Sequence, residues 1–251
     1  AEGSMTADEM AGKVQTVLGL IEPSALGVTM THEHLLCDVS VAHEVPHEAS
    51  AKALFDQPLS LDNLGYVRHY NAPNLDNALL LDENVAIEEA RLYKRLGGDS
   101  MVDATSIGIA RDPDALARIS RASEVQVVMG SSYYVGDAHP EDMDSRTEQE
   151  IVDEIVRDVN EGAGQHLIRS GIIGEVGCSW PLEDNERKVL RASARAQRLT
   201  GAPMLIHPGR DETAPLEIID VLAEVDADLN RTIVGHLDRT VFERSSLTSI
   251  A

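Results

Sequence analysis

Two histidines, His32 and His34, stand two residues apart at the end of an apolar run, 27–30. Because side chains of a β-strand alternate between its two faces, both histidines point the same way and Glu33 points the opposite way. Two imidazoles on one face of a strand can chelate one metal ion. The alternative is a hydrogen-bonded polar pair at a strand end. Further candidate ligands elsewhere in the chain would favour the metal site over this alternative.

Three further residues with metal-binding side chains stand at the ends of later apolar runs: Glu175, His207 and His236. Glu175 lies in a glycine-flanked position and could serve as a ligand, as a bridge between two metals or as a general base. An ion pair between Glu175 and an arginine is the alternative, because buried carboxylates need partners. Four histidines and a carboxylate exceed the three protein ligands of one catalytic zinc. They suit two ions about 3.5–4 Å apart, bridged by Glu175 and a hydroxide.

Apolar runs and amphipathic stretches alternate along the chain. This alternation predicts an α/β fold, a (β/α)8 barrel, in which the carboxyl ends of the strands meet at one mouth. A doubly wound sheet is disfavoured, because no glycine-rich phosphate loop follows the first run. The predicted strands are 28–34, 100–104, 125–130, 171–176, 203–207 and 231–236, and the predicted helices are 82–96, one opened by Asp112, 148–161, 184–199 and 215–224.

The number of predicted strands departs from a complete barrel. The sequence is expected to cover about six βα units and to lack the last two of a (β/α)8 barrel, with an open six-stranded sheet as the less favoured alternative. The segment 36–81 has no clear period and is expected to hold irregular or short helical structure over the site. Residues 1–12 resemble a tag remnant with a disordered N-terminus, and 13–251 are expected to form one metal-binding barrel domain, incomplete at its C-terminus.

The composition excludes several classes of partner. The 251 residues carry a formal net charge of -22, which repels nucleic acid and anionic lipid. No apolar run approaches the ~20 residues of a membrane span. We therefore expect a small-molecule substrate, no nucleic acid and no membrane, and we leave a homo-oligomer open. Cys37 and Cys178 form no disulfide framework and indicate a reducing compartment, the cytoplasm.

Several segments resemble the phosphotriesterase-related proteins of the amidohydrolase superfamily, over essentially all of 13–251. The resemblance implies a (β/α)8 metallohydrolase. It matches His32 and His34 to the family's first-strand ligands and Glu175 to its bridging residue, where phosphotriesterases proper carry a carboxylated lysine. It matches His207 and His236 to the ligands after strands five and six. The family also uses an aspartate after strand eight as metal ligand and proton shuttle, and no residue here fills that role. The matching segments are 12–20, 31–35, 108–112, 171–181, 206–210 and 235–239.

Four other residues are candidates for supporting roles. The resemblance to lactonases makes Tyr134 a substrate contact over the metals, with a packed aromatic at the barrel rim as the alternative. Arg210 and Arg239 follow ligand histidines and could hold an anionic group, or they could pair with the many carboxylates. Asp103 ends the second predicted strand and is expected to hydrogen-bond a ligand histidine.

These patterns together predict a binuclear, zinc-dependent hydrolase that uses a metal-bridging hydroxide. The resemblance is closest to enzymes acting on N-acyl amino acids or N-acyltaurines, so amide hydrolysis of such a small molecule is the favoured reaction. Lactone, ester or phosphotriester hydrolysis on the same site is the alternative. A degenerate barrel that binds a small ligand without catalysis is the alternative of another class.

Overall fold

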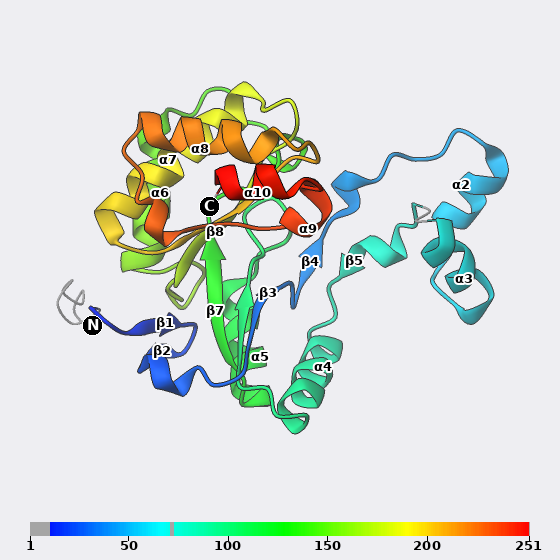
Figure 1. Cartoon of the computed structure of the whole chain (residues 1–251). Coiled ribbons are helices and arrows are strands. Elements are labelled where there is room, and N and C mark those ends of the chain that lie inside the picture. Colours follow the sequence, from blue (N-terminus) through cyan, green and yellow to red (C-terminus); the bar gives the residue numbers. More distant parts are fainter. Residues whose placement is uncertain (1–10, 71–72, 251) are drawn as a thin grey trace.

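A curled sheet of six parallel strands forms a half-barrel at the centre of the molecule (Figure 1). The computed structural model of the chain describes residues 11–70 and 73–250. The sheet order is β10-β9-β8-β7-β6-β3. Each strand of this sheet therefore pairs with the sheet's next strand in chain order, as in repeated βα units. All six predicted strands are confirmed, with shifts at their ends. They are β3 (Thr29–Glu33), β6 (Ser100–Asp103), β7 (Gln126–Ser131), β8 (Ile172–Gly177), β9 (Met204–His207) and β10 (Thr232–Val234).

The helices that connect these strands begin where the sequence supplies capping residues. The Asp112 carboxylate accepts a hydrogen bond from the Ala115 N–H, and Pro113 occupies the first helical turn. Thr147 and Glu150 form a reciprocal capping box at the start of the next helix. The five predicted helices are thereby confirmed as α4 (Glu83–Arg95), α5 (Pro113–Ser123), α6 (Glu148–Asn160), α7 (Asp184–Thr200) and α8 (Ala214–Glu224).

The side chains of the strands alternate between two apolar clusters. Ile173 and Met204 belong to the large cluster that includes buried residues of α6, α7 and α8. Their neighbours Ile172 and Leu205 lie in a smaller cluster with Val128, on the opposite face of the sheet. Both faces of the strands are therefore covered, which explains why the strands read as continuous apolar runs.

A short antiparallel hairpin, β1 (Val14–Thr16) and β2 (Gly19–Ile21), contacts the amino-terminal ends of the strands. The Val17 N–H donates to the Val127 carbonyl at 2.8 Å, and Val14 packs against the smaller cluster. The sequence pattern does not predict this hairpin, because two strands of three residues are too short to show alternation. Because the hairpin lies at the amino-terminal ends of the strands, it leaves their carboxyl ends free for the site.

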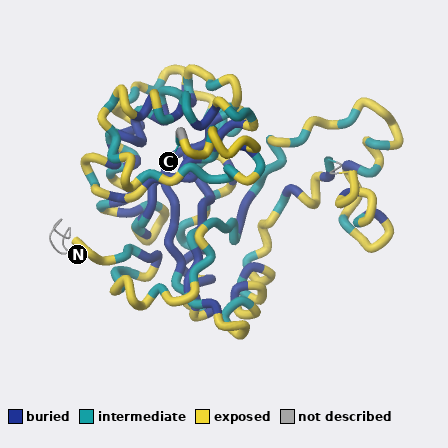
Figure 2. Tube along the Cα trace, in the orientation of Figure 1, coloured by how far each residue is buried: buried dark blue, intermediate teal, exposed yellow. Residues whose placement is uncertain are grey.

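The segment 36–81 contains the predicted short helices, but these helices do not cover the site; residues 76 and 79–81 at the end of the segment line a cavity beside His34. It leaves β3 through β4 (Cys37–Asp38), continues through α2 (Ala49–Phe55) and α3 (Leu61–Tyr70) and returns through β5 (Leu79–Leu80). Figure 1 shows α2 and α3 projecting away from the half-barrel, and Figure 2 shows that most of this arm is exposed. The expected placement over the site is therefore wrong. The arm buries few apolar side chains of its own, Phe55 and Val67 among them, so little apolar packing draws it onto the sheet.

After β10 the chain forms α9 (Leu237–Thr240) and α10 (Arg244–Ile250). Across residues 11–70 and 73–250, none of the helices combines the length and the apolar character that crossing a bilayer requires. Cys37 and Cys178 are both free and buried. The short 3₁₀ helices are η1 (Pro23–Ala25), η2 (Ser40–Ala42), η3 (Asp76–Ala78), η4 (Gly136–Ala138) and η5 (Leu229–Arg231). Residues 1–10 of the proposed N-terminal segment 1–12 lie outside the described residues.

Candidate metal centre

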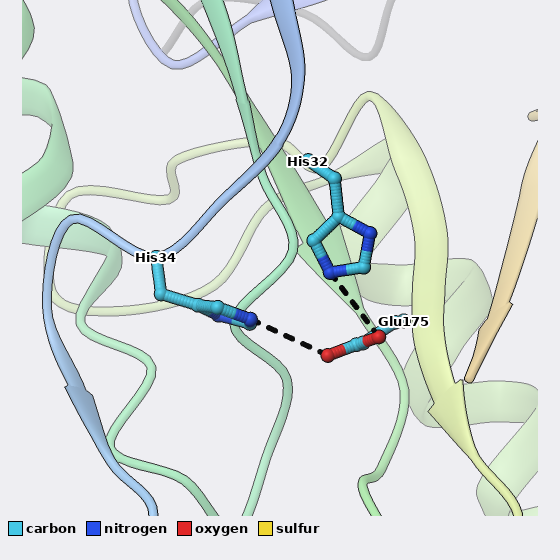
Figure 3. A group of neighbouring side chains, drawn as sticks. All are labelled: His32, His34 and Glu175. Carbon is cyan, nitrogen blue, oxygen red and sulfur yellow. Dashed lines mark ion pairs between the residues drawn. The ribbon is translucent and has the colours of Figure 1, made fainter. Parts of the chain in front are cut away.

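The Glu175 carboxylate on β8 lies among four histidines at the carboxyl ends of the strands. His32 Nε2 lies 3.3 Å from Glu175 Oε2, and His34 Nε2 lies 3.4 Å from Glu175 Oε1 (Figure 3). His207 Nδ1 and His236 Nε2 lie 3.0 and 3.2 Å from Glu175 Oε2, the same oxygen that His32 approaches. The structure thus brings together all five residues that the sequence singles out, from four different strands.

Local backbone conformations allow this convergence. Gly174 precedes Glu175 with a φ of +123°, and a Cβ there would lie 2.1 Å from the Leu205 carbonyl oxygen of β9. Only glycine fits this close approach of two strands. His236 follows β10 in the left-handed region, with a φ of 55°. A non-glycine residue in that region is uncommon and is often found at functional sites.

The five side chains form two groups of potential ligand atoms that share Glu175. We call His32, His34 and Glu175 the first half-site, and Glu175, His207 and His236 the second half-site. Within each half-site the three ligand atoms all lie within 4.8 Å of one another. Imidazole nitrogen and carboxylate oxygen are ligands that suit zinc and similar divalent ions.

The chemistry of the donor atoms also fits a bound cation. His32 Nε2 is buried and, although Glu175 Oε2 lies 3.3 Å away, it forms no well-aligned hydrogen bond with any residue that the structure describes. A buried nitrogen without a partner is costly in a folded protein. A metal ion at the first half-site would accept the lone pair of this nitrogen, so the residues present fit the ions that the sequence predicts.

Glu175 is almost completely buried, with 1% of its side chain exposed. Burial by itself raises the pKa of this carboxyl, but the surrounding histidine rings hold the pKa far below its ordinary value. Glu175 is therefore an anion. Its partners are histidines, whereas the alternative from the sequence was an ion pair with an arginine. A buried anion at the centre of the cluster is a charge that favours bound cations.

The two half-sites differ in their electrostatics. Burial lowers the pKa of both His34 and His207, and Glu175 opposes that effect in both. The net pKa is raised for His34, where Asp103 and Glu33 add negative charge. It is lowered for His207, where His236 and Arg239 add positive charge.

Thr105 is a supporting residue that the sequence pattern does not indicate. Its Oγ1 lies 3.0 Å from His34 Nδ1. The expectation that Asp103 would bind a histidine is wrong, because its carboxylate instead accepts hydrogen bonds from the Leu35 N–H at 2.8 Å and the Thr105 N–H at 3.1 Å. No spacing rule links Thr105 to His34, since the contact depends on the pairing of β3 with β6.

The three predicted substrate contacts lie at different distances from the cluster. The Tyr134 hydroxyl lies 3.4 Å from His207 Nδ1. Arg239 Nη2 donates to His207 Nε2 at 3.1 Å and is half-buried. Arg210 is exposed. Tyr134 and Arg239 therefore contact the second half-site through His207.

Glu186, near the start of α7, joins the two loops beside the second half-site. Its buried carboxylate accepts hydrogen bonds from the Gly136 N–H at 2.8 Å and the Ser179 N–H at 2.9 Å. The first belongs to the loop that carries Tyr134, and the second to the loop after β8. Glu183 and Glu186 also form a capping box, and this Glu-x-x-Glu spacing is the sequence signal that could have identified Glu186.

Comparisons with known proteins agree with this geometry. A protein-family model described as the phosphotriesterase family matches residues 12–251. N-acetyltaurine hydrolases of Salmo salar and Homo sapiens are 41% and 40% identical over 243 residues, which are 96% of this chain and 69% of each relative. A crystal structure of a resiniferatoxin-binding protein from Rhodobacter sphaeroides superposes with a TM-score of 0.91 at 37% identity, over 96% of this chain and 67% of that chain.

Proposed function

Because the chain belongs to the phosphotriesterase family of metal-dependent hydrolases, with a half-barrel of the TIM-barrel type, we propose that it is a binuclear zinc hydrolase. Its favoured substrate is a small N-acyl amino acid or N-acyltaurine, cleaved at the amide bond. The observation that carries the proposal is the sharing of Glu175 between two groups of ligand atoms. One carboxylate between two histidine pairs is an arrangement suited to two ions.

In this proposal His32 and His34 would hold one ion, His207 and His236 would hold the other, and Glu175 would be a ligand common to both. When bound, two divalent ions supply the positive charge that activates water and polarises the scissile carbonyl group. Glu175 would be the catalytic residue in the sense that its buried negative charge would hold the ions at the reacting centre. All five side chains stand on strands of the half-barrel or within two residues of a strand end, so little reorganisation accompanies the reaction.

The second half-site supplies the groups that would meet a substrate. Arg239 is half-buried beside His207, and Arg210 stands exposed at the rim. A guanidinium binds a carboxylate or sulfonate through two parallel hydrogen bonds. The Tyr134 hydroxyl, 3.4 Å from His207 Nδ1, could donate to the carbonyl oxygen. Relatives named N-acetyltaurine hydrolase, at about 40% identity, support a substrate that is an acylated amine with an acidic group.

The proposal also covers the partners and the location. A net charge of -22 disfavours nucleic acid and anionic membranes, so the partner is a small-molecule substrate, and association into a homo-oligomer is open to measurement. Two free, buried cysteines fit a reducing compartment, which we take to be the cytoplasm.

Hydrolysis of a matched set of substrates tests the proposed reaction. The natural protein, loaded with zinc, is assayed with N-acetyltaurine, an N-acetyl amino acid, an uncharged N-acetyl amine and a simple lactone. We expect the highest kcat/KM on the acidic amides. Faster turnover of the lactone would replace the amidase proposal with the lactonase alternative. Absence of turnover on all four substrates, with both ions bound, would favour a barrel that only binds its ligand.

A further inference from the structure

The hydroxyl of Thr105 is buried at the end of β6 and faces the first half-site. Its Oγ1 lies 3.2 Å from the Leu36 carbonyl and 3.0 Å from His34 Nδ1. A carbonyl oxygen accepts hydrogen bonds and cannot donate, so the single hydroxyl proton of Thr105 goes to Leu36. The lone pair of Thr105 Oγ1 is then directed to His34, which must be the donor.

The contact with Thr105 places a proton on Nδ1 of His34. When Nδ1 donates to Thr105, the proton of the neutral imidazole resides on Nδ1, and Nε2 keeps its lone pair. Nε2 is the nitrogen that faces Glu175 Oε1, at 3.4 Å. The nitrogen directed into the first half-site is therefore the one that is free to bind a cation.

The contact between Thr105 and His34 is itself held in place by a buried carboxylate. Asp103 accepts from the Thr105 N–H through Oδ1 and from the Leu35 N–H through Oδ2. Leu35 is the residue next to His34, so one carboxylate fixes the backbone on both sides of the hydrogen bond. Asp103 is fully buried, so neither bond competes with bulk water.

We propose that Thr105 is a positioning residue, which sets the tautomer and orientation of His34 and thereby tightens ion binding at the first half-site. Partners of this kind behind a ligand histidine typically change metal affinity about 10–100-fold. His207 lacks a comparable partner, because its second nitrogen faces the guanidinium of Arg239, which can only donate. The effect of Thr105 is therefore confined to one ion.

Two substitutions separate the hydrogen bond from the packing of the side chain. Thr105→Val keeps the shape and removes the acceptor, whereas Thr105→Ser keeps the acceptor and removes a methyl group. Ser106→Ala is the matched control, since Ser106 is also buried and its Oγ has no hydrogen-bond partner among the residues described. Chelator competition with zinc measures the affinity of each ion in every variant.

We expect Thr105→Val to weaken one of the two ions about tenfold or more, with the other ion unchanged. Thr105→Ser and Ser106→Ala should both retain the affinity of the natural protein. Equal affinities in Thr105→Val and the natural protein would overturn the proposal. A loss in Ser106→Ala as large as in Thr105→Val would also overturn it, because it would show a general packing effect.

The affinity measurement rests on the proposed function. The protonation state of His34 Nδ1 is a second readout, and it can be measured without any bound ion. Ring ¹⁵N NMR of histidine-labelled, ion-free protein reports whether His34 Nδ1 carries a proton, and a His34→Asn spectrum assigns the signal. We expect a protonated Nδ1 with a nuclear Overhauser contact to Thr105. An unprotonated Nδ1 would overturn the proposal even if both ions bind. Failure of the natural protein to bind any ion would instead refute the binuclear function and leave the NMR result to decide on Thr105.

Discussion

The two half-sites share one carboxylate, yet the surroundings of their histidines differ. In the first half-site, His34 contacts Thr105, which is anchored by the buried Asp103. In the second half-site, His207 contacts Tyr134 in the loop after β7 and Arg239 in the short helix α9, both beyond the ends of the strands. The first half-site is thus supported from the interior of the fold, and the second borders on groups that a substrate could reach.

This difference separates two tasks that the proposed binuclear site would perform. Hydrogen bonds inside the fold hold a ligand at a fixed position, which favours tight and permanent ion binding. Loop residues with polar ends favour recognition of a ligand that arrives and leaves. We therefore expect substitutions near His34 to change ion affinity, and substitutions near His207 to change substrate affinity.

The substitution with the largest expected effect removes the charge that both half-sites share. Glu175→Gln keeps the shape but replaces the buried anion by a neutral amide, so both ions lose their common ligand. We expect roughly a hundredfold lower activity and a loss of ion affinity in both half-sites. Elemental analysis and kcat together measure this. Full occupancy and full turnover in Glu175→Gln would show that Glu175 is not the bridge.

Glu186→Gln sharpens the comparison, because Glu186 supports only the loops of the second half-site. The amide leaves some of the N–H groups around position 186 without an acceptor, which should lower the free energy of unfolding by about 1–3 kcal/mol. Urea denaturation measures the stability, and chelator competition measures the ions. We expect ion affinity at the first half-site to stay unchanged. Equal loss at both half-sites would mean that they are not independently supported.

Arg239→Gln tests the assignment of substrate recognition to the second half-site. Loss of a charge-assisted hydrogen bond should raise the KM for an acidic N-acyl substrate about tenfold, with little change for an uncharged one. Arg231→Gln is the matched control, because Arg231 is exposed and pairs with Asp228 away from the cluster. An equal rise in KM for both substrates would remove the anion-binding role from Arg239.

Tyr134→Phe should have the smallest effect. It removes one hydroxyl near His207 while keeping the ring, so we expect about a three- to tenfold lower kcat and no change in ion content, the range of one neutral hydrogen bond. Tyr66→Phe on the projecting arm is the control. A change in ion content for Tyr134→Phe would indicate that the hydroxyl supports an ion rather than a substrate.

The sequence predicts the elements of the half-barrel because its signals are local. Buried parallel strands require continuous apolar runs, and helices begin at residues such as Asp112 and Thr147, whose side chains cap them. The five residues of the candidate centre can be found in the same way, because each stands at the end of such a run. The barrel then brings strand ends together without further information.

What the sequence does not reveal depends on contacts between distant residues. Thr105 and His34 are 71 positions apart, and their contact exists only because β6 pairs with β3. The hairpin before the first strand of the half-barrel is too short for a pattern. The placement of the arm 36–81 follows from how little of it the protein buries, which no periodicity reports.

The number of ions bound by the natural protein tests the central claim most directly. The protein is purified without added chelator, and zinc, manganese, iron and cobalt are measured together with protein concentration. Two groups of ligand atoms that share Glu175 predict close to two divalent ions per chain. A value that stays near zero after incubation with zinc would contradict the binuclear account.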